Sequence, residues 1–575
     1  MPSLSQTSSL EIYDLRAASP EVLLSVSTLV GLINRGPARV YCLENSDDEF
    51  WLKELDPSLA CISSSVAGDK VLEHLLVSQR ELVVGLVIYD PRLLDTRNVA
   101  TTLAALRGGI VATPELASRL QQAPYHLTVL EDLRVYNWKS RAQAYFWAYK
   151  HLLPECSPDL LAGMAPTLCG GLRSYLVTQR VFTSWLDARK IIPEFGAGGY
   201  CERGLLKRLF ASFHPGALHL GWFVSEPFGI RLASRAALLT LASDHCTNLA
   251  VWSSMPGQHE QTPSLLEQIT TPSTMGQAPE QTPAPSSSTM EQAPEQTPAP
   301  TPSTMGQAPE QTSAPNSSAM EQVPEQTPAS FPSTSDGAIG QANEPSDADV
   351  TYLSFTISDG DNLQYCQHRL LRLWSDPARG KLPLGWTIAP ALWQTMPRLA
   401  AFYRRTASEQ DSLIAGPSGV AYILPSYWPR EHRVAFLQLT ATALHALGPA
   451  LLQVLDSGTW FSMRFLSADL QELFVSQLAA HGLRGILSGA GSGVPSWQRR
   501  SGLLVYQNLG LALNPQHTLN LIQNAQARGM RFINVYILAW DITPSDLLRI
   551  VQQLEGKVHA VTPARLLELI EAAAK

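Results

Sequence analysis

Residues 351–362 read TYLSFTISDGDN, an apolar run that ends abruptly in two aspartates, one glycine and an asparagine. A run of β-branched and aromatic residues that stops at Asp, Gly and Asn is typical of a buried strand followed by a turn. Asp359 and Asp361 occupy alternate positions, so in an extended segment both side chains would face the same way. The sequence therefore places two carboxyl groups where a buried strand ends.

Similar apolar runs recur through the rest of the C-terminal part. We predict strands at 353–357, 384–388, 420–424, 452–455, 485–487, 503–506 and 532–538. Helices are expected between them, at 430–447, 467–481, 515–528 and 544–554, the last with Thr543 as its cap. A regular succession of strand and helix favours a parallel (β/α) barrel-like domain, complete or distorted, over residues 347–575.

The N-terminal half also predicts an α/β fold. Apolar runs at 38–43, 82–89 and 109–112 indicate strands, and Thr113 followed by Pro114 marks the start of a helix. A further helix is expected at 172–185. We predict three small α/β subdomains here, at 8–78, 79–152 and 153–254.

The segment between the two halves has a different composition. Residues 255–346 are rich in Pro, Thr, Ser, Gln and Glu, and methionines recur at 275, 290, 305 and 320. Such a segment cannot bury enough apolar surface to offset its ordering entropy, so we predict a disordered low-complexity linker. It is either a spacer or docking segment, or an expanded repeat inserted into a surface loop, which we favour.

Composition and charge exclude several classes of partner. The 575 residues carry a formal net charge of −8, which argues against a nucleic-acid or anionic-membrane partner. No signal peptide is recognised, and the apolar run at 22–33 is too short and serine-rich to span a membrane, so we expect a cytoplasmic protein. Seven scattered cysteines without a CxxC pair fit reduced thiols.

Carboxyl groups follow several of the predicted C-terminal strands. Besides Asp359 and Asp361, Asp456 follows the run at 452–455 and Asp541 follows the run at 532–538. In a parallel barrel these strand ends meet at one rim. Paired carboxylates suit glycoside hydrolysis, with one proton donor and one base or nucleophile. We predict these four aspartates as the catalytic set; the alternative, equally favoured for SDGDN, is a tight turn.

Other side chains near these strand ends could hold a substrate. Aromatic faces pack against sugar rings, so we predict contacts from three tryptophans, while each could instead belong to the core. Asn362 and Tyr422 would bond sugar hydroxyls. Glu226 could reach the rim if the two halves close over it, although an ion pair at the surface or between domains is the favoured alternative. The predicted tryptophans are Trp386, Trp428 and Trp540.

Other kinds of site lack their required residues. A metal-dependent polysaccharide deacetylase needs closely spaced histidines, whereas the C-terminal histidines are isolated. The glycine-rich run 489–493 lacks the lysine of a phosphate-binding loop. A calcium loop starting at Asp359 lacks its acidic twelfth residue. We therefore predict no metal site and no cofactor.

The segment Gly419-Val-Ala-Tyr-Ile-Leu-Pro425 is similar to the motif that names the GxGYxYP glycoside hydrolase family. It departs from the motif at Ala421, in place of the second glycine, and at Leu424, in place of the second tyrosine. The loss of the tyrosine hydroxyl puts one substrate contact in doubt. Other C-terminal stretches resemble the family in order, namely 357–364, 385–390, Asp411 ahead of 416–419, and 540–541.

The N-terminal half resembles the same family. The relevant stretches are 29–35, 89–91, 98–102, Gly221-Trp222 with Glu226, and Ser243-Asp244 with Asn248. The resemblance covers nearly the whole chain apart from the linker. It implies carbohydrate processing and a carbohydrate substrate, and it does not fix a catalytic pair or a protein partner.

These observations lead to three hypotheses. The first is a glycoside hydrolase that uses carboxylate acid/base chemistry at the rim of the C-terminal domain. The second is a non-catalytic carbohydrate-binding or scaffold protein with the same pocket. The third is a metal-assisted carbohydrate deacetylase.

Overall fold

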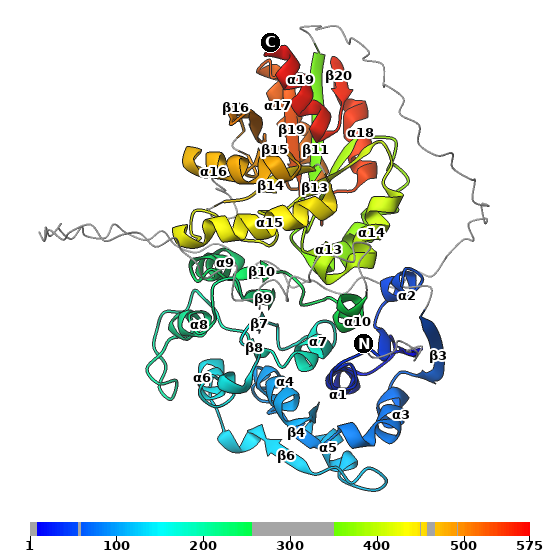
Figure 1. Ribbon diagram of the computed structural model, residues 1–575. Coiled ribbons are helices and arrows are strands. Elements are labelled where there is room, and N and C mark those ends of the chain that lie inside the picture. Colours follow the sequence, from blue (N-terminus) through cyan, green and yellow to red (C-terminus); the bar gives the residue numbers. More distant parts are fainter. Residues whose placement is uncertain are drawn as a thin grey trace, which may run out of the picture. The chain divides into compact units, whose positions relative to one another are not determined.

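The structure is a computed structural model that describes residues 9–55, 59–255, 350–448, 450–456, 466–491 and 493–574 (Figure 1). The predicted linker, apart from Met255, lies outside the described residues. The mixed α/β class that the sequence predicts is confirmed, and the strands of the described residues form four mostly parallel sheets.

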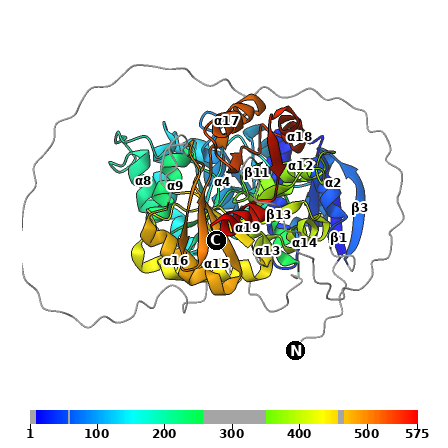
Figure 2. The same ribbon diagram turned by 90° about the horizontal axis from the view of Figure 1, so that it is seen from above.

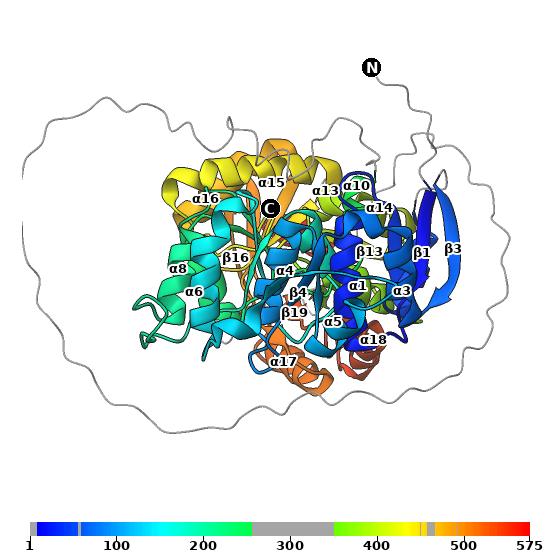
Figure 3. The same cartoon turned by 90° about the horizontal axis from the view of Figure 1, so that it is seen from below.

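The first sheet has the parallel strand order β2-β1-β3. Its strands are β1 (Ser9–Asp14), β2 (Val40–Leu43) and β3 (Ala60–Ala67). The helices of this part are α1 (Pro20–Ile33), α2 (Ser46–Leu52) and α3 (Lys70–Ser78). Helix α1 is almost entirely buried because, as Figure 3 shows, it lies between α3 and α4 (Thr96–Arg107).

The second sheet has the parallel order β5-β4-β6. Its strands are β4 (Gly85–Ile88), β5 (Gly109–Ala112) and β6 (Val129–Asp132), and helices α5 (Pro114–Leu120) and α6 (Arg141–His151) belong to the same part. The predicted start of α5 is confirmed, since the Thr113 hydroxyl accepts a hydrogen bond from the Leu116 N–H at 3.0 Å. A capped first turn with proline behind the cap fixes where the helix begins.

The third sheet has the order β10-β9-β7-β8. Its strands are β7 (Leu160–Gly163), β8 (Phe182–Ser184), β9 (Leu218–Gly221) and β10 (Leu239–Leu241); its helices are α7 (Arg173–Thr178), α8 (Glu202–Phe210), α9 (Glu226–Arg235) and α10 (Leu249–Ser254). The helix predicted at 172–185 is wrong in its second half. The chain leaves α7 at Thr178, and Phe182 and Thr183 are buried in a strand beside β7, which suits aromatic and β-branched residues.

Within the described residues, the C-terminal sheet has ten strands, and β11 (Val350–Ile357) is the third strand from one end of the path. The order is β16-β17-β15-β14-β13-β12-β11-β19-β18, and β20 pairs with β11 off this path. The other strands are β12 (Leu384–Ile388), β13 (Asp411–Ala415), β14 (Ala450–Val454), β15 (Leu483–Ser488), β16 (Ser496–Arg500), β17 (Leu503–Gln507), β18 (Leu511–Ala512), β19 (Phe532–Ile537) and β20 (Lys557–Ala560). All described pairings are parallel except that of β16 with β17. Among the described strands the order is an open path from β16 to β18, so this sheet does not close into a barrel.

Helices cover both faces of this sheet. Figure 2 shows α15 (Arg433–Leu447) and α16 (Ala468–Leu478) on one side and α17 (Pro515–Ala527) and α18 (Pro544–Gln553) on the other, and Figure 3 agrees. The remaining helices are a π-helix at Tyr365–Arg369, α12 (Leu370–Trp374), α13 (Leu392–Thr395), α14 (Pro397–Thr406) and α19 (Pro563–Ala573). Burial on both faces explains the continuous apolar sequence of β11. No helix in the described part of the chain is long and apolar enough to cross a membrane.

One predicted strand of this sheet is wrong. The run 420–424 lies outside the sheet, and β13 (Asp411–Ala415) occupies the place between β12 and β14. The run instead contacts the third sheet, where Tyr422 forms an antiparallel bridge with Thr240 of β10. Its backbone hydrogen bonds are therefore satisfied by a distant partner.

Candidate active site

The loop that follows β11 contains both carboxyl groups of the SDGDN stretch. Asp359 adopts a left-handed backbone conformation with φ of 72°, which aspartate tolerates better than most residues. Its N–H donates a hydrogen bond to the phenolic oxygen of Tyr536, and its carboxylate accepts one from the Ser358 hydroxyl at 3.0 Å. The stretch is thus a tight turn, and this turn holds the Asp359 carboxylate in a defined position.

Gly360 lets this loop lie directly on the neighbouring strand. Its N–H donates to the Thr387 hydroxyl of β12 at 2.9 Å. A Cβ atom at this position would stand 2.2 Å from the Thr387 carbonyl carbon and 2.3 Å from the Ile388 nitrogen. Both contacts are with backbone, so only glycine fits without displacing the two aspartates.

The two carboxyl groups differ in their affinity for protons. Burial raises the pKa of Asp359 to about 6, against the opposing effect of hydrogen bonds from Ser358 and Trp540. Burial raises the pKa of Asp361 well above its usual value, and the charges of Asp359 and Glu226 raise it further. Asp361 therefore holds its proton more strongly than an ordinary aspartate, and Asp359 is the more readily ionised of the pair.

Glu226 reaches this loop from the N-terminal half. It is the first residue of α9, and its carboxylate accepts a hydrogen bond from the Tyr422 hydroxyl at 3.1 Å. Burial and then the charge of Glu226 raise the pKa of the Tyr422 phenol well above its usual value, so the phenol stays protonated as a donor. The structure therefore brings Glu226, Tyr422 and Asp361 together.

The motif-like segment around Tyr422 is fixed on both sides. The Tyr422 N–H donates to the Thr240 carbonyl at 2.9 Å, and its ring stacks on Trp222 with centroids 6.2 Å apart. A Cβ atom on Gly419 would lie 2.6 Å from the Phe436 ring, so glycine is required there by close packing. Ala421 is buried outside the left-handed region, so this departure from the motif introduces no backbone strain.

Asn362 has a structural role next to the carboxyl groups. Its side-chain oxygen accepts the Tyr365 N–H at 2.9 Å, at the start of the π-helix. The adjacent Leu363 N–H donates to the Ala242 carbonyl at 2.8 Å. A role in bonding sugar hydroxyls stays a prediction for Asn362.

The three predicted tryptophans lie in different environments. Trp540 is 47% exposed, and its side chain hydrogen-bonds the Asp359 carboxylate. Trp386 is fully buried and donates to Asp411 at 2.8 Å, while Trp428 is buried and donates to the His432 carbonyl at 3.2 Å. Trp386 and Trp428 therefore occupy the core, and Trp540 is the one of the three with an exposed face beside a carboxylate.

Asp456 and Asp541 are not part of the described carboxylate contacts. Asp456 is buried and accepts hydrogen bonds from both the N–H and the hydroxyl of Ser426, the first at 2.9 Å, which fixes the turn after residue 424. Asp541 is exposed. Burial lowers the pKa of Arg369, and the charge of Asp541 opposes this effect. Asp359 and Glu226 are the two carboxylates whose charges raise the pKa of Asp361.

Three aromatic side chains of this site were not predicted as site residues. Tyr536 accepts the Asp359 N–H, and Trp222 stacks on Tyr422. The buried Tyr365 hydroxyl has no hydrogen-bond partner in the described part of the chain. The resemblance includes Gly221-Trp222, which could have indicated Trp222; the position of Tyr536 depends on the pairing of β19 with β11.

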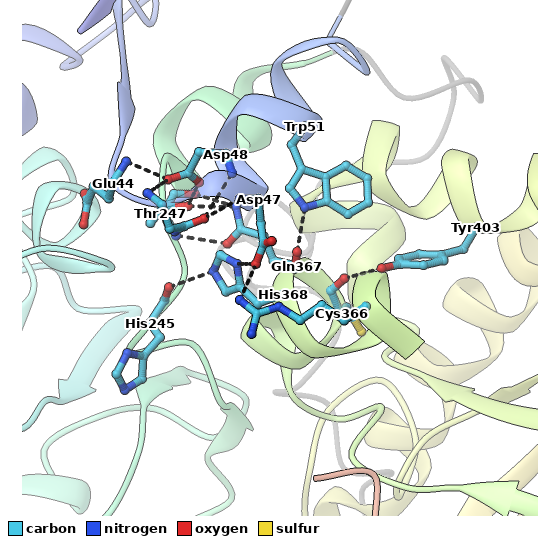
Figure 4. Close-up of polar contacts among 12 residues, drawn as sticks. Glu44, Asp47, Asp48, Trp51, His245, Thr247, Cys366, Gln367, His368 and Tyr403 are labelled. Carbon is cyan, nitrogen blue, oxygen red and sulfur yellow. Dashed lines mark hydrogen bonds and ion pairs between the residues drawn. The ribbon is translucent and has the colours of Figure 1, made fainter. Parts of the chain in front are cut away.

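The π-helix that follows the loop is held by hydrogen bonds to Trp51, Thr247 and Tyr403 (Figure 4). The Trp51 indole N–H of α2 donates to the Gln367 carbonyl at 2.6 Å. The Gln367 amide donates to the Thr247 carbonyl at 3.1 Å, and the Thr247 hydroxyl donates to Asp48. The Tyr403 hydroxyl donates to the Cys366 carbonyl at 2.6 Å. These bonds fix the backbone that follows the two aspartates.

Two carboxyl groups, those of Asp47 and Asp48, take part in the contacts around the π-helix. Burial raises the pKa of Asp48 to about 6. Burial also acts on Asp47, but hydrogen bonding to His368 and the charge of Arg372 outweigh it and lower the pKa of Asp47. The His368 Nδ1 lies 3.1 Å from the Asp47 carboxylate. Figure 4 marks this contact with a dashed line. Within the described ranges, no three His, Cys, Asp or Glu side chains are grouped as metal ligands.

Comparison with known families identifies the chain. Residues 9–60, 83–156 and 158–254 match the first, second and third N-terminal domains of one family, and residues 349–571 match its C-terminal domain, described as "GxGYxYP putative glycoside hydrolase C-terminal domain". The chain belongs to the GxGYxYP family. The resemblance predicted from the motif is confirmed, including its N-terminal extent.

One solved structure shares the fold over nearly the whole chain. A crystal structure described as "a putative hydrolase from Bacteroides thetaiotaomicron VPI-5482" is 18% identical, with a TM-score of 0.69 over 99% of this chain and 95% of that one. A structure described as "putative polysaccharide deacetylase from Mycobacterium smegmatis" is 10% identical over 40% of this chain and 93% of its own, with a TM-score of 0.29. No curated protein matches the sequence.

Proposed function

We propose that this GxGYxYP protein is a glycoside hydrolase whose carboxyl pair is Asp361 and Glu226. The observation that supports it is the raised pKa of the Asp361 carboxyl group. Part of this rise comes from the charge of Glu226, a carboxylate from the other half of the chain that accepts a hydrogen bond from Tyr422. Two carboxyl groups with pKa values pushed apart can act as acid and base in one site. Membership of the family supports a carbohydrate as the substrate.

Asp361 acts as the general acid in this proposal. Its raised pKa keeps a proton available at neutral pH, and that proton passes to the glycosidic oxygen as the bond to the anomeric carbon breaks. The departing alcohol carries the proton away, which leaves Asp361 ionised. Asp359, whose pKa is about 6, then adds a negative charge that favours reprotonation of Asp361 for the next cycle.

Glu226 acts as the base or nucleophile. The hydrogen bond from Tyr422 orients its carboxylate. As the base, Glu226 takes a proton from the water that attacks the anomeric carbon. As the nucleophile, it forms a glycosyl ester, which a water molecule deprotonated by the ionised Asp361 then hydrolyses. Positive charge develops on the sugar ring in the transition state, and the carboxylates of Glu226 and Asp359 stabilise it.

Aromatic side chains hold the sugar next to these groups. Trp540 presents an exposed ring beside Asp359, and Trp222 is partly buried against Tyr422. A flat, apolar indole face binds the C–H face of a sugar ring, while its N–H bonds a polar group.

Turnover on a panel of aryl glycosides and acetylated sugars tests this proposal. We would compare the wild-type protein with Asp361→Asn and Glu226→Gln, using Asp541→Asn, an exposed aspartate, as the control. Release of aglycone by the wild type and the control, with a loss of about 10²–10⁴-fold in the two variants, supports it.

Other outcomes favour the other hypotheses. Release of acetate that a chelator abolishes would favour a metal-assisted deacetylase. Sugar binding without turnover, only moderately weakened in the two variants, would favour a carbohydrate-binding protein.

A further inference from the structure

A separate cavity lies where the first and third parts of the chain contact the C-terminal sheet. Its volume is about 240 Å³, and its walls come from the end of α1, α7, β9, β10, α10, the loop after β11, and α13. None of Asp359, Asp361, Glu226 and Tyr422 lines it. The cavity is therefore distinct from the carboxylate site.

The walls of the cavity are uncharged. Part of the lining is formed by leucine side chains, among them Leu220, Leu241 and Leu363. Other lining residues carry hydroxyl and amide groups, including those of Thr178 and Gln394, and none of the described lining residues is charged. An ion would lose its hydration here without a partner, so the lining selects an uncharged molecule that has both apolar and polar groups.

Gln394 gives a second, independent indication of a ligand. Both the oxygen and the nitrogen of its side-chain amide are buried, and neither has a hydrogen-bond partner in the described part of the chain. A buried polar group that stays unsatisfied destabilises the fold, so such groups are normally paired. After a small rotation of the amide, adjacent hydroxyls of a ligand could donate to the oxygen and accept from the nitrogen.

The volume sets the size of this ligand. An apolar cavity of about 150 Å³ holds benzene, so 240 Å³ corresponds to a molecule of about ten non-hydrogen atoms. We propose that this cavity is a second binding site that takes an uncharged monosaccharide of pentose size. The C–H face of the sugar packs on the leucines, and its adjacent hydroxyls pair with Gln394.

Binding of D-xylose, followed by saturation-transfer NMR and calorimetry on the full chain, tests this site. We expect the wild type to bind D-xylose and to reject D-xylonate, which has a similar size and a negative charge. Gln394→Leu should weaken binding about tenfold or more, since the amide pairing is lost. Ser253→Trp, at an exposed position on the lining, should block entry.

Control variants and a Tm measurement distinguish binding at this site from binding at the carboxylate site, and loss of binding from loss of folding. Asp361→Asn should bind D-xylose as the wild type does, and so should Gln523→Leu, an exposed glutamine on α17. Without sugar, Gln394→Leu should keep or raise the Tm, because it removes an unpaired buried amide.

Three results would overturn the proposal. These are undetectable D-xylose binding, equal binding by the wild type and Gln394→Leu, and loss of binding in Asp361→Asn. The last would place the sugar in the carboxylate site. None of these measurements depends on turnover, so they stand apart from the test of the proposed function.

Discussion

The Tyr422 hydroxyl donates a hydrogen bond of 3.1 Å to the carboxylate of Glu226, although 196 positions separate the two residues in the sequence. This bond joins the motif-like segment after β13 to the first turn of α9. It orients the Glu226 carboxylate, and the charge of Glu226 adds to burial and to the charge of Asp359 in raising the pKa of Asp361. The candidate site is therefore built by both halves of the chain.

Removing only this hydroxyl should affect activity more than stability. Tyr422→Phe keeps the ring that stacks on Trp222 and loses the bond that orients Glu226. We expect kcat to fall about 10-fold or more, with a loss of unfolding free energy of about 1 kcal/mol. Tyr427→Phe, which keeps the ring under Arg231 and Arg235, is the control for kcat and for urea unfolding. Equal kcat in the two variants would contradict the role of Tyr422.

Gly360→Ala should disturb the active loop because the added Cβ would meet the backbone of β12 at 2.2 Å. We expect a destabilisation of about 1–3 kcal/mol and a marked loss of turnover, since Asp359 and Asp361 flank the glycine. Gly510→Ala, whose added Cβ would meet only the Leu521 side chain at 3.4 Å, should be close to neutral. Chemical unfolding and turnover of both variants check this, and an active, stable Gly360→Ala protein would refute the packing argument.

The anchor of the π-helix should influence both stability and turnover. Trp51→Phe leaves the buried Gln367 carbonyl without the indole N–H that it accepts at 2.6 Å. We expect a loss of about 1–3 kcal/mol in unfolding free energy, together with a lower kcat from a looser Asp359 loop. Trp497→Phe changes a tryptophan that is 42% exposed and should alter stability by less than about 0.5 kcal/mol. A wild-type kcat in Trp51→Phe would show that the anchor serves the fold alone.

Glu44 should make the stability of the fold depend on pH. Burial, and then the charge of Asp48, raises the pKa of Glu44 from 4.5 to about 8, so folding favours its protonated form. This contribution to stability is fully present below pH 4.5 and is lost as the pH rises through about 8. Glu44→Gln should therefore be more stable than the wild type at pH 8, by up to about 4 kcal/mol, and equal to it at pH 4.5 or below.

Urea unfolding of both proteins across this pH range measures the difference. Glu73→Gln on α3 is an exposed control that should show no such trend. A difference between wild type and Glu44→Gln that is constant with pH would show that Glu44 is not the titrating group.

Local patterns in the sequence were sufficient for many elements. The prediction of β5 at 109–112 and of β12 at 384–388 is confirmed to the residue, because each is a short apolar run bounded by turn or cap signals. The runs 420–424 and 411–415 show where local patterns fail. Either run could fill the place beside β12, and the bridge of Tyr422 to Thr240 assigns it to 411–415.

The sequence by itself determined that Asp359 and Asp361 follow a buried strand, that the fold alternates strands and helices, and that the chain belongs to its family. Only the tertiary structure decided that the charge of Glu226 acts on Asp361, that Trp386 lies in the core and that Asp456 binds Ser426. The physical reason is the separation along the sequence over which each kind of interaction acts. Strand and turn signals act over a few neighbouring residues, whereas the partners of a buried carboxyl group depend on which distant segments pack together.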